Sequence, residues 1–553
     1  MIPAVGPPMR LWPTRRLYIY CTGPSEHPPI SHVAVPAAPS SRLPVPPSLQ
    51  FHPRAPMNLP DLLRIPLHQT PDKCALEFAA ADGVRRWTYA ELHRKAACFA
   101  SWLLGQGLAR GDRVMIMAAN SDHFVVACLA VWQTGAILVP VNTRYRKSEL
   151  AHIVGDCQPA LILADSACAG HLADIAGIKR NRMPVHGLEP DSVPHESADP
   201  PPLSGDDTCM LLYTSGTTGL CKGAMISHNN MVATVAGLLA AWAWRPDDVL
   251  LLTLPLFHVH GLQVGLTCAL AAGATVLLRS SFDAEATIGE LSQACASLFF
   301  GVPTMYYRLI QALEAMTPPQ FPRMRLFCSG SGPLAAEDHR TFERLTGHVI
   351  LERYGMTETG MNFSNPLAGP RIPGSVGLPL PGVSARVVDA DDRSVPPGTE
   401  GWLLVRGSNV FKGYWNNPEA TSAAFVPDAY GHLWFRTGDM AVLDPDSHYL
   451  TLLGRGHELI ICGGINVYPR EIEEVLIAHD GVREAAVVGR GDPEWGQVPV
   501  AFLVADRPVD TGSLLDHCRS HLASFKAPRT CHFVDELPRN ALGKLQKFAL
   551  PKP

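Results

Sequence analysis

The stretch Leu211-Leu-Tyr-Thr-Ser-Gly-Thr-Thr-Gly-Leu-Cys-Lys-Gly223 decides how the rest of the chain is interpreted. A short apolar strand over 208–213 is expected to open into a loop of hydroxyls and glycines that ends at a lysine. Glycines let backbone N–H groups approach an anion, hydroxyls donate hydrogen bonds, and lysine adds a positive charge. The pattern predicts a polyphosphate-binding loop, whose candidate residues are Thr214, Ser215, Gly216, Thr217, Thr218, Gly219 and Lys222.

This loop differs from a Walker A loop, because no glycine directly precedes the lysine and no Ser or Thr follows it. The alternative is a polar surface turn between a strand and a helix. A solvated turn has no need for so many phosphate donors, so the phosphate-binding interpretation is favoured.

Length and composition narrow the class of protein. The 553 residues predict three or four folding units, with 46% hydrophobic and 18% charged residues as in a globular protein. The net charge of −5 gives no basic footprint for nucleic acid. Fourteen cysteines without a C-x-x-C pair indicate reduced thiols, and no apolar run reaches the ~18–20 residues of a membrane span. We therefore expect a soluble cytoplasmic protein.

Residues 1–56 differ from the rest because prolines recur throughout and Glu26 is the only acid. So much proline opposes helix formation, and the segment is predicted to be a disordered leader. A transit peptide, which would make the protein mitochondrial, is the alternative, since the segment carries arginines and almost no acids. Translation from Met57 is a further possibility that the composition permits.

From Met57 onward, apolar strands alternate with helical patterns. Helix starts are expected near Leu59 and Trp87, the second with Thr88 and Glu91 as a capping box. Such alternation predicts an α/β fold with doubly wound parallel sheets. The expected strands lie at 114–117, 136–141, 160–164, 249–254, 275–278 and 297–300, and a helix at 124–132.

The pattern changes twice towards the C-terminus. Short strands with turn signals around 383–405 predict a small β-rich subdomain. After Gly454 a helix at 469–478 and strands at 484–488 and 498–504 predict a compact, mobile α+β domain behind a glycine-flanked hinge. The expected organisation is a large N-terminal domain at 57–453, a hinge at 454–457 and a C-terminal domain at 458–553.

The phosphate loop resembles that of the adenylate-forming superfamily, which includes acyl-CoA synthetases, carrier-protein adenylation domains and luciferases. A second motif, Glu352-Arg-Tyr-Gly-Met-Thr-Glu-Thr-Gly360, fits the same resemblance. It implies that Glu358 is a Mg²⁺ ligand, since Mg²⁺ prefers carboxylate oxygen. Thr357 is then expected to donate to the α-phosphate, while Tyr354 and Gly355 lie against adenine.

Further motifs are expected to complete the nucleotide site. Cys328-Ser-Gly-Ser-Gly-Pro-Leu334 formally matches a dinucleotide fingerprint, but Pro333 sits where a regular helix start is needed. The resemblance makes Ser329, Gly330 and Ser331 an adenine-lining turn instead. In Phe435-Arg-Thr-Gly-Asp439 the aspartate suits both ribose hydroxyls, and Arg455 adds a donor to the same sugar.

Two segments are expected to act on the reacting acid. Pro538-Arg-Asn-Ala-Leu-Gly-Lys544 resembles the family's catalytic-lysine loop, in which Lys544 would bridge the carboxylate and the α-phosphate. Phe257-His-Val-His260 has no third ligand nearby, which disfavours a metal site. The family uses this segment to line the acyl pocket, with His258 near the reactive carboxylate.

Within the family the sequence is most similar to malonyl-CoA synthetases, on Glu352–Pro366, Gly301-Val-Pro-Thr-Met-Tyr-Tyr-Arg308 and Phe411-Lys-Gly-Tyr-Trp. The implied reaction converts malonate, ATP and CoA into malonyl-CoA, AMP and pyrophosphate. Burying malonate's second carboxylate needs a cation, and Arg308 is the candidate, ahead of Arg279 and Arg371. Methylmalonate or another short or medium acid is the alternative substrate, and an ATP-binding non-catalytic homologue is the alternative class.

The resemblance also implies a second active arrangement for CoA, reached by rotation at a hinge on His457, where the family usually has Asp or Lys. Gly463 and Gly464 would contact the pantetheine chain, and Arg470 is a candidate partner for CoA phosphates. Cys221 stands where the family usually has proline. The expected partners are the small-molecule substrates alone, with no nucleic acid and no membrane span, and the protein is expected to be a monomer or homodimer.

Overall fold

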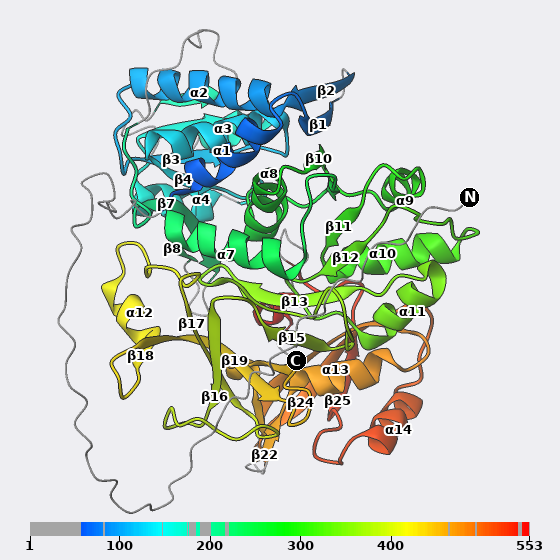
Figure 1. Cartoon of the computed structure of the whole chain (residues 1–553). Helices are drawn as coiled ribbons and strands as arrows, with labels where there is room; N and C mark the ends of the chain where they lie inside the picture. Colours follow the sequence, from blue (N-terminus) through cyan, green and yellow to red (C-terminus); the bar gives the residue numbers. More distant parts are fainter. Residues whose placement is uncertain are drawn as a thin grey trace, which may run out of the picture. The chain divides into compact units, whose positions relative to one another are not determined.

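The computed structural model describes residues 57–80, 83–145, 147–173, 175, 184–188, 201–215, 221–462, 465–492, 495–539 and 545–551 (Figure 1). The predicted leader at 1–56 lies outside the described residues, as do 216–220 of the phosphate loop. No helix in the described ranges is long and apolar enough to cross a membrane.

The phosphate loop belongs to a six-stranded sheet of order β6-β5-β3-β4-β7-β8. All pairings in it are parallel except β7 with β8. The loop therefore joins two antiparallel strands, not a strand and a helix as the surface-turn alternative assumed. The strands are β3 (Arg113–Met117), β4 (Ile137–Pro140), β5 (Leu161–Ala164), β6 (Val185–Gly187), β7 (Thr208–Ser215) and β8 (Cys221–Ser227).

A longer sheet of order β16-β17-β19-β20-β15-β14-β13-β12-β11-β9-β10-β1-β2 supplies the other half of the site. The six neighbouring strands β13, β12, β11, β9, β10 and β1 pair in parallel. At the edge of the sheet, β2 pairs antiparallel with β1. These strands are β1 (Cys74–Ala80), β2 (Gly83–Thr88), β9 (Val249–Leu252), β10 (Thr275–Leu278), β11 (Leu298–Gly301), β12 (Leu326–Ser329) and β13 (Leu351–Met356). The prediction of doubly wound α/β sheets is confirmed, with antiparallel strands added at the edges.

The sheet continues antiparallel beyond β13, as the β-rich subdomain predicted around 383–405. The subdomain is larger than expected, because it also takes in strands from before and after that range. Its elements are β14 (Gly360–Ser364), β15 (Ser375–Pro379), β16 (Val383–Val388), β17 (Gly401–Gly407), α12 (Pro418–Ala423), β18 (Phe425–Pro427), β19 (Leu433–Leu443) and β20 (Leu450–Arg455).

Helices connect the strands of both sheets, and α7 packs against β8 and β14, so it touches each sheet. The capping box predicted at Thr88 is present, since its hydroxyl accepts from Glu91 N at 3.1 Å. The helix starts at Tyr89, however, because Trp87 and Thr88 pair in β2. The helices are α1 (Leu59–Gln69), α2 (Tyr89–Gly105), α3 (Asp122–Thr134), α4 (Lys147–Cys157), α5 (Ser166–Ala173), α7 (His228–Ala241), the π-helix η2 (His260–Thr267), α8 (Cys268–Ala271), α9 (Ala284–Ser292), α10 (Pro303–Glu314) and α11 (Ala336–Thr346).

The C-terminal part has a sheet and an apolar core of its own. The sheet has the order β22-β21-β24-β23, with β25 beside β24. Residues such as Leu476, Val487 and Leu503 form its buried core. The domain boundaries at 453 and 457 stay proposals. The elements are the 3₁₀ helix η3 (Gly456–Glu458), β21 (Ile460–Cys462), β22 (Ile465–Val467), α13 (Pro469–Ile477), β23 (Val482–Asp492), β24 (Gly496–Ala505), α14 (Thr511–His521), β25 (Thr530–Phe533) and the 3₁₀ helix η4 (Lys547–Ala549).

A buried carboxylate at the start of α3 ties this helix to the β1–β2 hairpin. Asp122 is fully buried and accepts hydrogen bonds from Arg85 Nε at 2.9 Å, Arg85 Nη2 at 2.8 Å and Trp87 Nε1 at 2.9 Å. Burial alone would raise the pKa of Asp122, but these donors outweigh it and the pKa is lowered. The ionised carboxylate is therefore a stabilising feature of the folded chain.

We predict that Asp122→Asn lowers the free energy of unfolding by about 3 kcal/mol, because it removes the charge that Arg85 faces. Since the folded pKa lies below the unfolded value of ~3.9, this contribution is present above pH ~4 and is lost as the pH falls through the folded pKa. Thermal midpoints measured from pH 7 to pH 3 test both statements. Glu337→Gln, in an exposed pair with Arg340, is the control and should change little; equal shifts for the two variants would contradict the prediction.

Candidate active site

The two described ends of the phosphate loop meet the predicted metal ligand. Thr214 Oγ1 donates to Glu358 Oε1 at 3.2 Å, and the Tyr414 hydroxyl donates to the same oxygen at 3.1 Å. Lys222 Nζ lies 4.8 Å from the centre of the Tyr414 ring. Residues from β7, β8, the turn after β13 and the segment before α12 therefore converge here. The side chain of Ser215 and residues Gly216, Thr217, Thr218 and Gly219 lie outside the described residues.

The donor set around Glu358 fits a hard divalent cation. Its side chain is buried, and its neighbours offer hydroxyl oxygens rather than thiols or imidazoles. Burial and the adjoining Glu358 carboxylate raise the pKa of Tyr414, so this phenol keeps its proton and acts as a donor. Within the described residues no group of three or more His, Cys, Asp and Glu side chains could hold a metal by itself. An ion here would need phosphate or water oxygens to complete its coordination.

Asp439 and Arg455, both predicted to contact ribose, are direct neighbours. They lie opposite each other on β19 and β20, with Arg455 Nε 3.0 Å from Asp439 Oδ1. Burial would lower the pKa of Arg455, but the Asp439 carboxylate raises it. The Tyr354 hydroxyl donates to Asp439 Oδ2. Because the Tyr354 ring is itself buried, beside Phe363, its contact with adenine stays a prediction.

The adenine-lining turn predicted after β12 lies beside the histidine segment. Ser331 has a left-handed backbone with φ +69°, and its hydroxyl lies 3.2 Å from His260 Nδ1. The backbone N–H of His260 donates to His258 Nδ1 at 3.3 Å. Burial and then the charges of Arg353 and His258 hold the pKa of His260 well below its usual value. The His260 imidazole is therefore neutral and adjoins the turn directly.

Gly355 occupies a position with no room for a side chain. A Cβ there would lie 2.1 Å from the carbonyl oxygen of Gly360, across the β13–β14 pairing. The close approach of these strands places the turn that carries Thr357 and Glu358. Packing therefore explains why position 355 is a glycine. The expected contact of Gly355 with the nucleotide stays a prediction.

The three arginines considered for the second carboxylate differ in burial and partners. Arg308 is exposed on α10 and forms no ion pair with the described residues. The argument from a buried carboxylate therefore does not apply to it, and its role stays a prediction. Arg279 is paired with Glu290 at 2.6 Å and with Glu77 at 3.4 Å.

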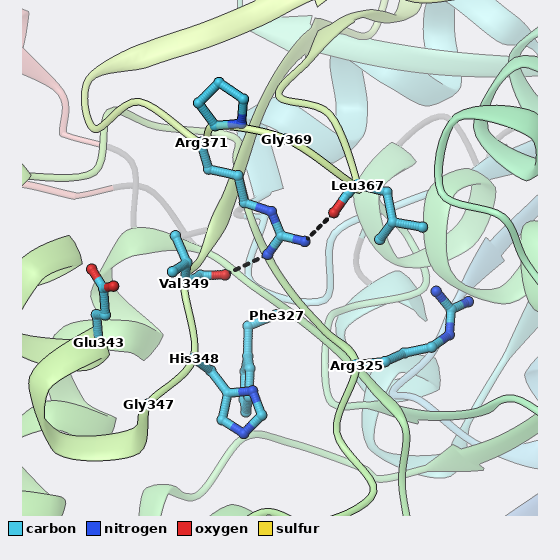
Figure 2. A pocket seen from close by; sticks show the side chains of 10 residues that line it. Arg325, Phe327, Glu343, Gly347, His348, Val349, Leu367, Gly369 and Arg371 are labelled. Atoms are coloured by element: carbon cyan, nitrogen blue, oxygen red, sulfur yellow. Dashed lines mark hydrogen bonds between the residues drawn. The ribbon is translucent and has the colours of Figure 1, made fainter.

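Arg371 lines a hollow of about 450 Å³ together with Arg325 and His348 (Figure 2). Its guanidinium donates to the carbonyl oxygens of Val349 at 2.5 Å and Leu367 at 2.9 Å, so it fastens a loop. Arg325 is engaged by Asp248 at 2.5 Å. Arg325 is therefore paired with a carboxylate, whereas Arg371 is held by neutral carbonyl oxygens.

The residues predicted to serve CoA and catalysis in the C-terminal part are only partly described. Arg470 pairs with Glu474 at 2.9 Å and donates to Leu452 O at 3.0 Å. His457 lies in η3, with its side chain outside the described residues; Gly463, Gly464 and Lys544 also lie outside them.

The described residues around the Lys544 loop show how it is anchored. Arg539 and Leu545 form a bridge across the loop base. Lys547 Nζ lies 2.8 Å from Glu473 and 3.0 Å from Glu458, one residue after His457. Burial would lower the pKa of Lys547, but the two carboxylates raise it. The base of this loop is thus tied to the predicted hinge by ion pairs.

Two residues of this region were not assigned a role from sequence. Tyr414 contacts both Glu358 and Lys222. From the sequence, the segment Phe411-Lys-Gly-Tyr-Trp indicated only a resemblance to malonyl-CoA synthetases. Arg353 lies within the Glu352–Gly360 motif but had no function attached to it. The contacts of Tyr414 and the burial of Arg353 depend on segments distant in sequence. Only the presence of a charged residue inside a predicted strand could have drawn attention to Arg353.

Comparison with known proteins assigns the family. The AMP-binding enzyme model matches residues 64–415, and the AMP-binding enzyme C-terminal domain model matches 471–544. The chain belongs to the AMP-binding enzyme family. The predictions of an adenylate-forming fold and of an AMP-forming acyl-CoA synthetase that uses ATP and CoA are confirmed.

The relatives are ligases for several acids. A mitochondrial malonate–CoA ligase of Mus musculus is 36% identical over 520 residues, covering 86% of this chain and 88% of the relative. A feruloyl-CoA synthase of an Amycolatopsis species is 36% identical over 475 residues, covering 85% and 94%. The crystal structure of ATP-bound MatB from Rhodopseudomonas palustris superposes with a TM-score of 0.82 at 39% identity, covering 89% and 98%.

We predict that Glu358→Gln slows ATP–pyrophosphate exchange by about 10²–10³-fold, because it removes the buried charge at the phosphate loop. Tyr414→Phe is the matched comparison and removes only one hydrogen bond to Glu358, so a loss of about tenfold at most is expected. Exchange within threefold of the wild type for Glu358→Gln would rule out its predicted role.

Proposed function

We propose that the protein is a malonate:CoA ligase, which forms malonyl-CoA, AMP and pyrophosphate from malonate, ATP and CoA through a malonyl-adenylate. The observation that carries the proposal is similarity to a malonate–CoA ligase over 86% of the chain. The convergence of Thr214, Lys222 and Glu358 supports adenylation chemistry. Because a feruloyl-CoA synthase is equally identical, the acid itself is the part that needs an experiment.

In the proposed first step, a carboxylate oxygen attacks the α-phosphorus and pyrophosphate leaves. The phosphate loop would bind the β- and γ-phosphates, Thr357 would donate to the α-phosphate, and Asp439 with Arg455 would hold the ribose. Lys544 would lie between the acid and the α-phosphate as negative charge develops. No general base is required, since the acid is already ionised near neutral pH.

Mg²⁺ is part of the proposal, and Glu358 with Thr214 would hold it. When bound, the ion supplies charge neutralisation at the ATP phosphates. The other contributions come from the chain, which orients ATP and excludes water from the reacting carboxylate.

The second proposed step is attack of the CoA thiol on the adenylate, with release of AMP. Gly463 and Gly464 would let the pantetheine chain approach the backbone, and Arg470 would contact CoA phosphates. For this step Arg470 would have to exchange its partners Glu474 and Leu452 O. His457 is the proposed hinge between the two arrangements.

Turnover of a panel of acids tests the substrate. We expect pyrophosphate release to require ATP, Mg²⁺ and CoA, and kcat/KM to be highest for malonate among malonate, methylmalonate, acetate, octanoate, benzoate and ferulate. A higher kcat/KM for methylmalonate than for malonate would make methylmalonate the assigned substrate and leave the dicarboxylate class unchanged. Preference for octanoate, benzoate or ferulate would leave the ligase activity in place and overturn the malonate assignment.

A mitochondrial relative supports the alternative that residues 1–56 are a transit peptide, against the predicted cytoplasmic location. We predict that residues 1–56 fused to a fluorescent protein direct it to mitochondria if this alternative holds. The same reporter preceded by residues 57–112 is the control. A diffuse cytosolic signal from the first fusion would support the cytoplasmic location.

A further inference from the structure

We propose that His152 and Asp156, one turn apart on α4, are positioning residues that hold the two arms of the phosphate loop for binding of the β- and γ-phosphates. His152 in particular holds the carbonyl of Cys221, the residue that stands where the family usually has proline. The inference rests on the proposed function, because it takes the phosphate loop as the element that binds ATP. Neither side chain is expected to touch the nucleotide.

Asp156 holds the arm of the loop that belongs to β7. The Tyr213 hydroxyl donates to Asp156 Oδ2 at 2.6 Å. Burial raises the pKa of Tyr213, and the neighbouring Cys157 and Asp156 raise it further, so the phenol keeps its proton and acts as the donor. The next residue, Thr214, donates to Glu358. Asp156 therefore fixes the end of β7 from which the loop starts.

His152 holds the arm that belongs to β8. Its Nε2 lies 2.8 Å from the carbonyl oxygen of Cys221. A carbonyl oxygen can only accept, so this nitrogen carries the proton and donates. His152 and Asp156 are four residues apart in a helix and therefore lie on one face of α4. One helix face thus contacts both arms of the loop, at Tyr213 and at Cys221.

Packing does not set the position of the arms on this side. His152, Asp156, Cys221 and Lys222 line a hollow of about 440 Å³, together with Trp415 and the start of α12. Where a hollow takes the place of packed neighbours, directional hydrogen bonds decide where a strand end lies. The two bonds from α4 meet that need, one for each arm.

The bond from His152 falls on the position at which the family usually has proline. Proline holds φ at ~−65° through its ring, whereas cysteine leaves φ free. Gly216 and Gly219 add further backbone freedom to the sequence of this loop. His152 thus supplies by a hydrogen bond the fixed point that a proline ring would supply by its covalent geometry.

The geometry of β8 allows the proline to be restored. Main-chain groups of successive residues alternate between the two sides of a strand. Gly223 O accepts from Trp415 N at 2.7 Å and Met225 N donates to Gly413 O at 2.9 Å, so these two residues face away from β7. By the same alternation Cys221, the first residue of β8, faces away from β7. A proline there would remove no hydrogen bond between β7 and β8 and would keep the carbonyl.

The test measures binding of ATP and of AMP, each with Mg²⁺, by isothermal titration of the full chain without acid substrate. AMP lacks the β- and γ-phosphates, so a contact that serves the phosphate loop affects ATP alone. We expect His152→Ala and Asp156→Ala each to weaken ATP binding about five- to tenfold, the effect of roughly one hydrogen bond, and to leave AMP binding unchanged. His171→Ala, at an exposed histidine of α5, is the matched control and should change neither.

Conservative and compensating variants separate positioning from a general loss of structure. Asp156→Asn keeps an acceptor for the Tyr213 hydroxyl, and His152→Gln keeps a donor, so both should bind ATP more tightly than the alanine variants. Cys221→Pro added to His152→Ala should restore most of the lost ATP affinity, because the ring takes over the fixed point. Equal losses for ATP and AMP in the alanine variants would show a structural role and overturn the proposal. So would ATP binding by His152→Gln and by the double variant that is no tighter than that of His152→Ala.

Lys222→Met separates this inference from the proposed function. It removes the cation of the loop, so it should weaken ATP binding and spare AMP binding if the loop holds the phosphates. Wild-type ATP affinity in Lys222→Met would overturn the phosphate role of the loop itself. Weakened ATP binding in Lys222→Met, with wild-type affinity in His152→Ala and Asp156→Ala, would leave that role in place and overturn positioning by α4.

Discussion

The close approach of β13 and β14 is the constraint on which the site depends. A Cβ at position 355 would lie 2.1 Å from the carbonyl oxygen of Gly360, so the two strands could not lie this close with a side chain there. Along β13 and the turn after it, side chains are thereby directed to three places: Arg353 to the turn after β12, Tyr354 to Asp439, and Glu358 to the phosphate loop. A single strand and the turn after it thus connect the proposed ribose and phosphate parts of the site.

Ion pairs stabilise the described part of the chain at several places. Asp122 with Arg85, Asp248 with Arg325, and Lys547 with Glu458 and Glu473 are buried or half-buried charges that have their partners within the chain. Arg353 has no such partner in the described residues. An unpaired buried charge is costly, so Arg353 does not stabilise the fold as these ion pairs do.

Much of the fold could be predicted because its signals are local. Apolar runs such as 114–117 and 298–300 became buried strands, and the capping box at Thr88 and Glu91 formed as expected. The β1–β2 hairpin was missed, because its strands alternate weakly and β1 is held by β10, about two hundred residues away in sequence. The antiparallel return of β8 was also missed, because glycines permit several loop paths and do not specify one.

The sequence by itself determined the family, and it predicted the phosphate loop and the roles of the Glu352–Gly360 motif, because residue types at fixed spacing express the chemistry that ATP requires. It also predicted many of the buried strands and several helices, since hydrophobic periodicity is a local property. Only the tertiary structure decided that Arg353 is buried and Arg308 exposed, and that Tyr414 meets Glu358. Burial and charge pairing depend on which distant strands become neighbours in the fold. The spacing of residues along the chain does not specify those neighbours.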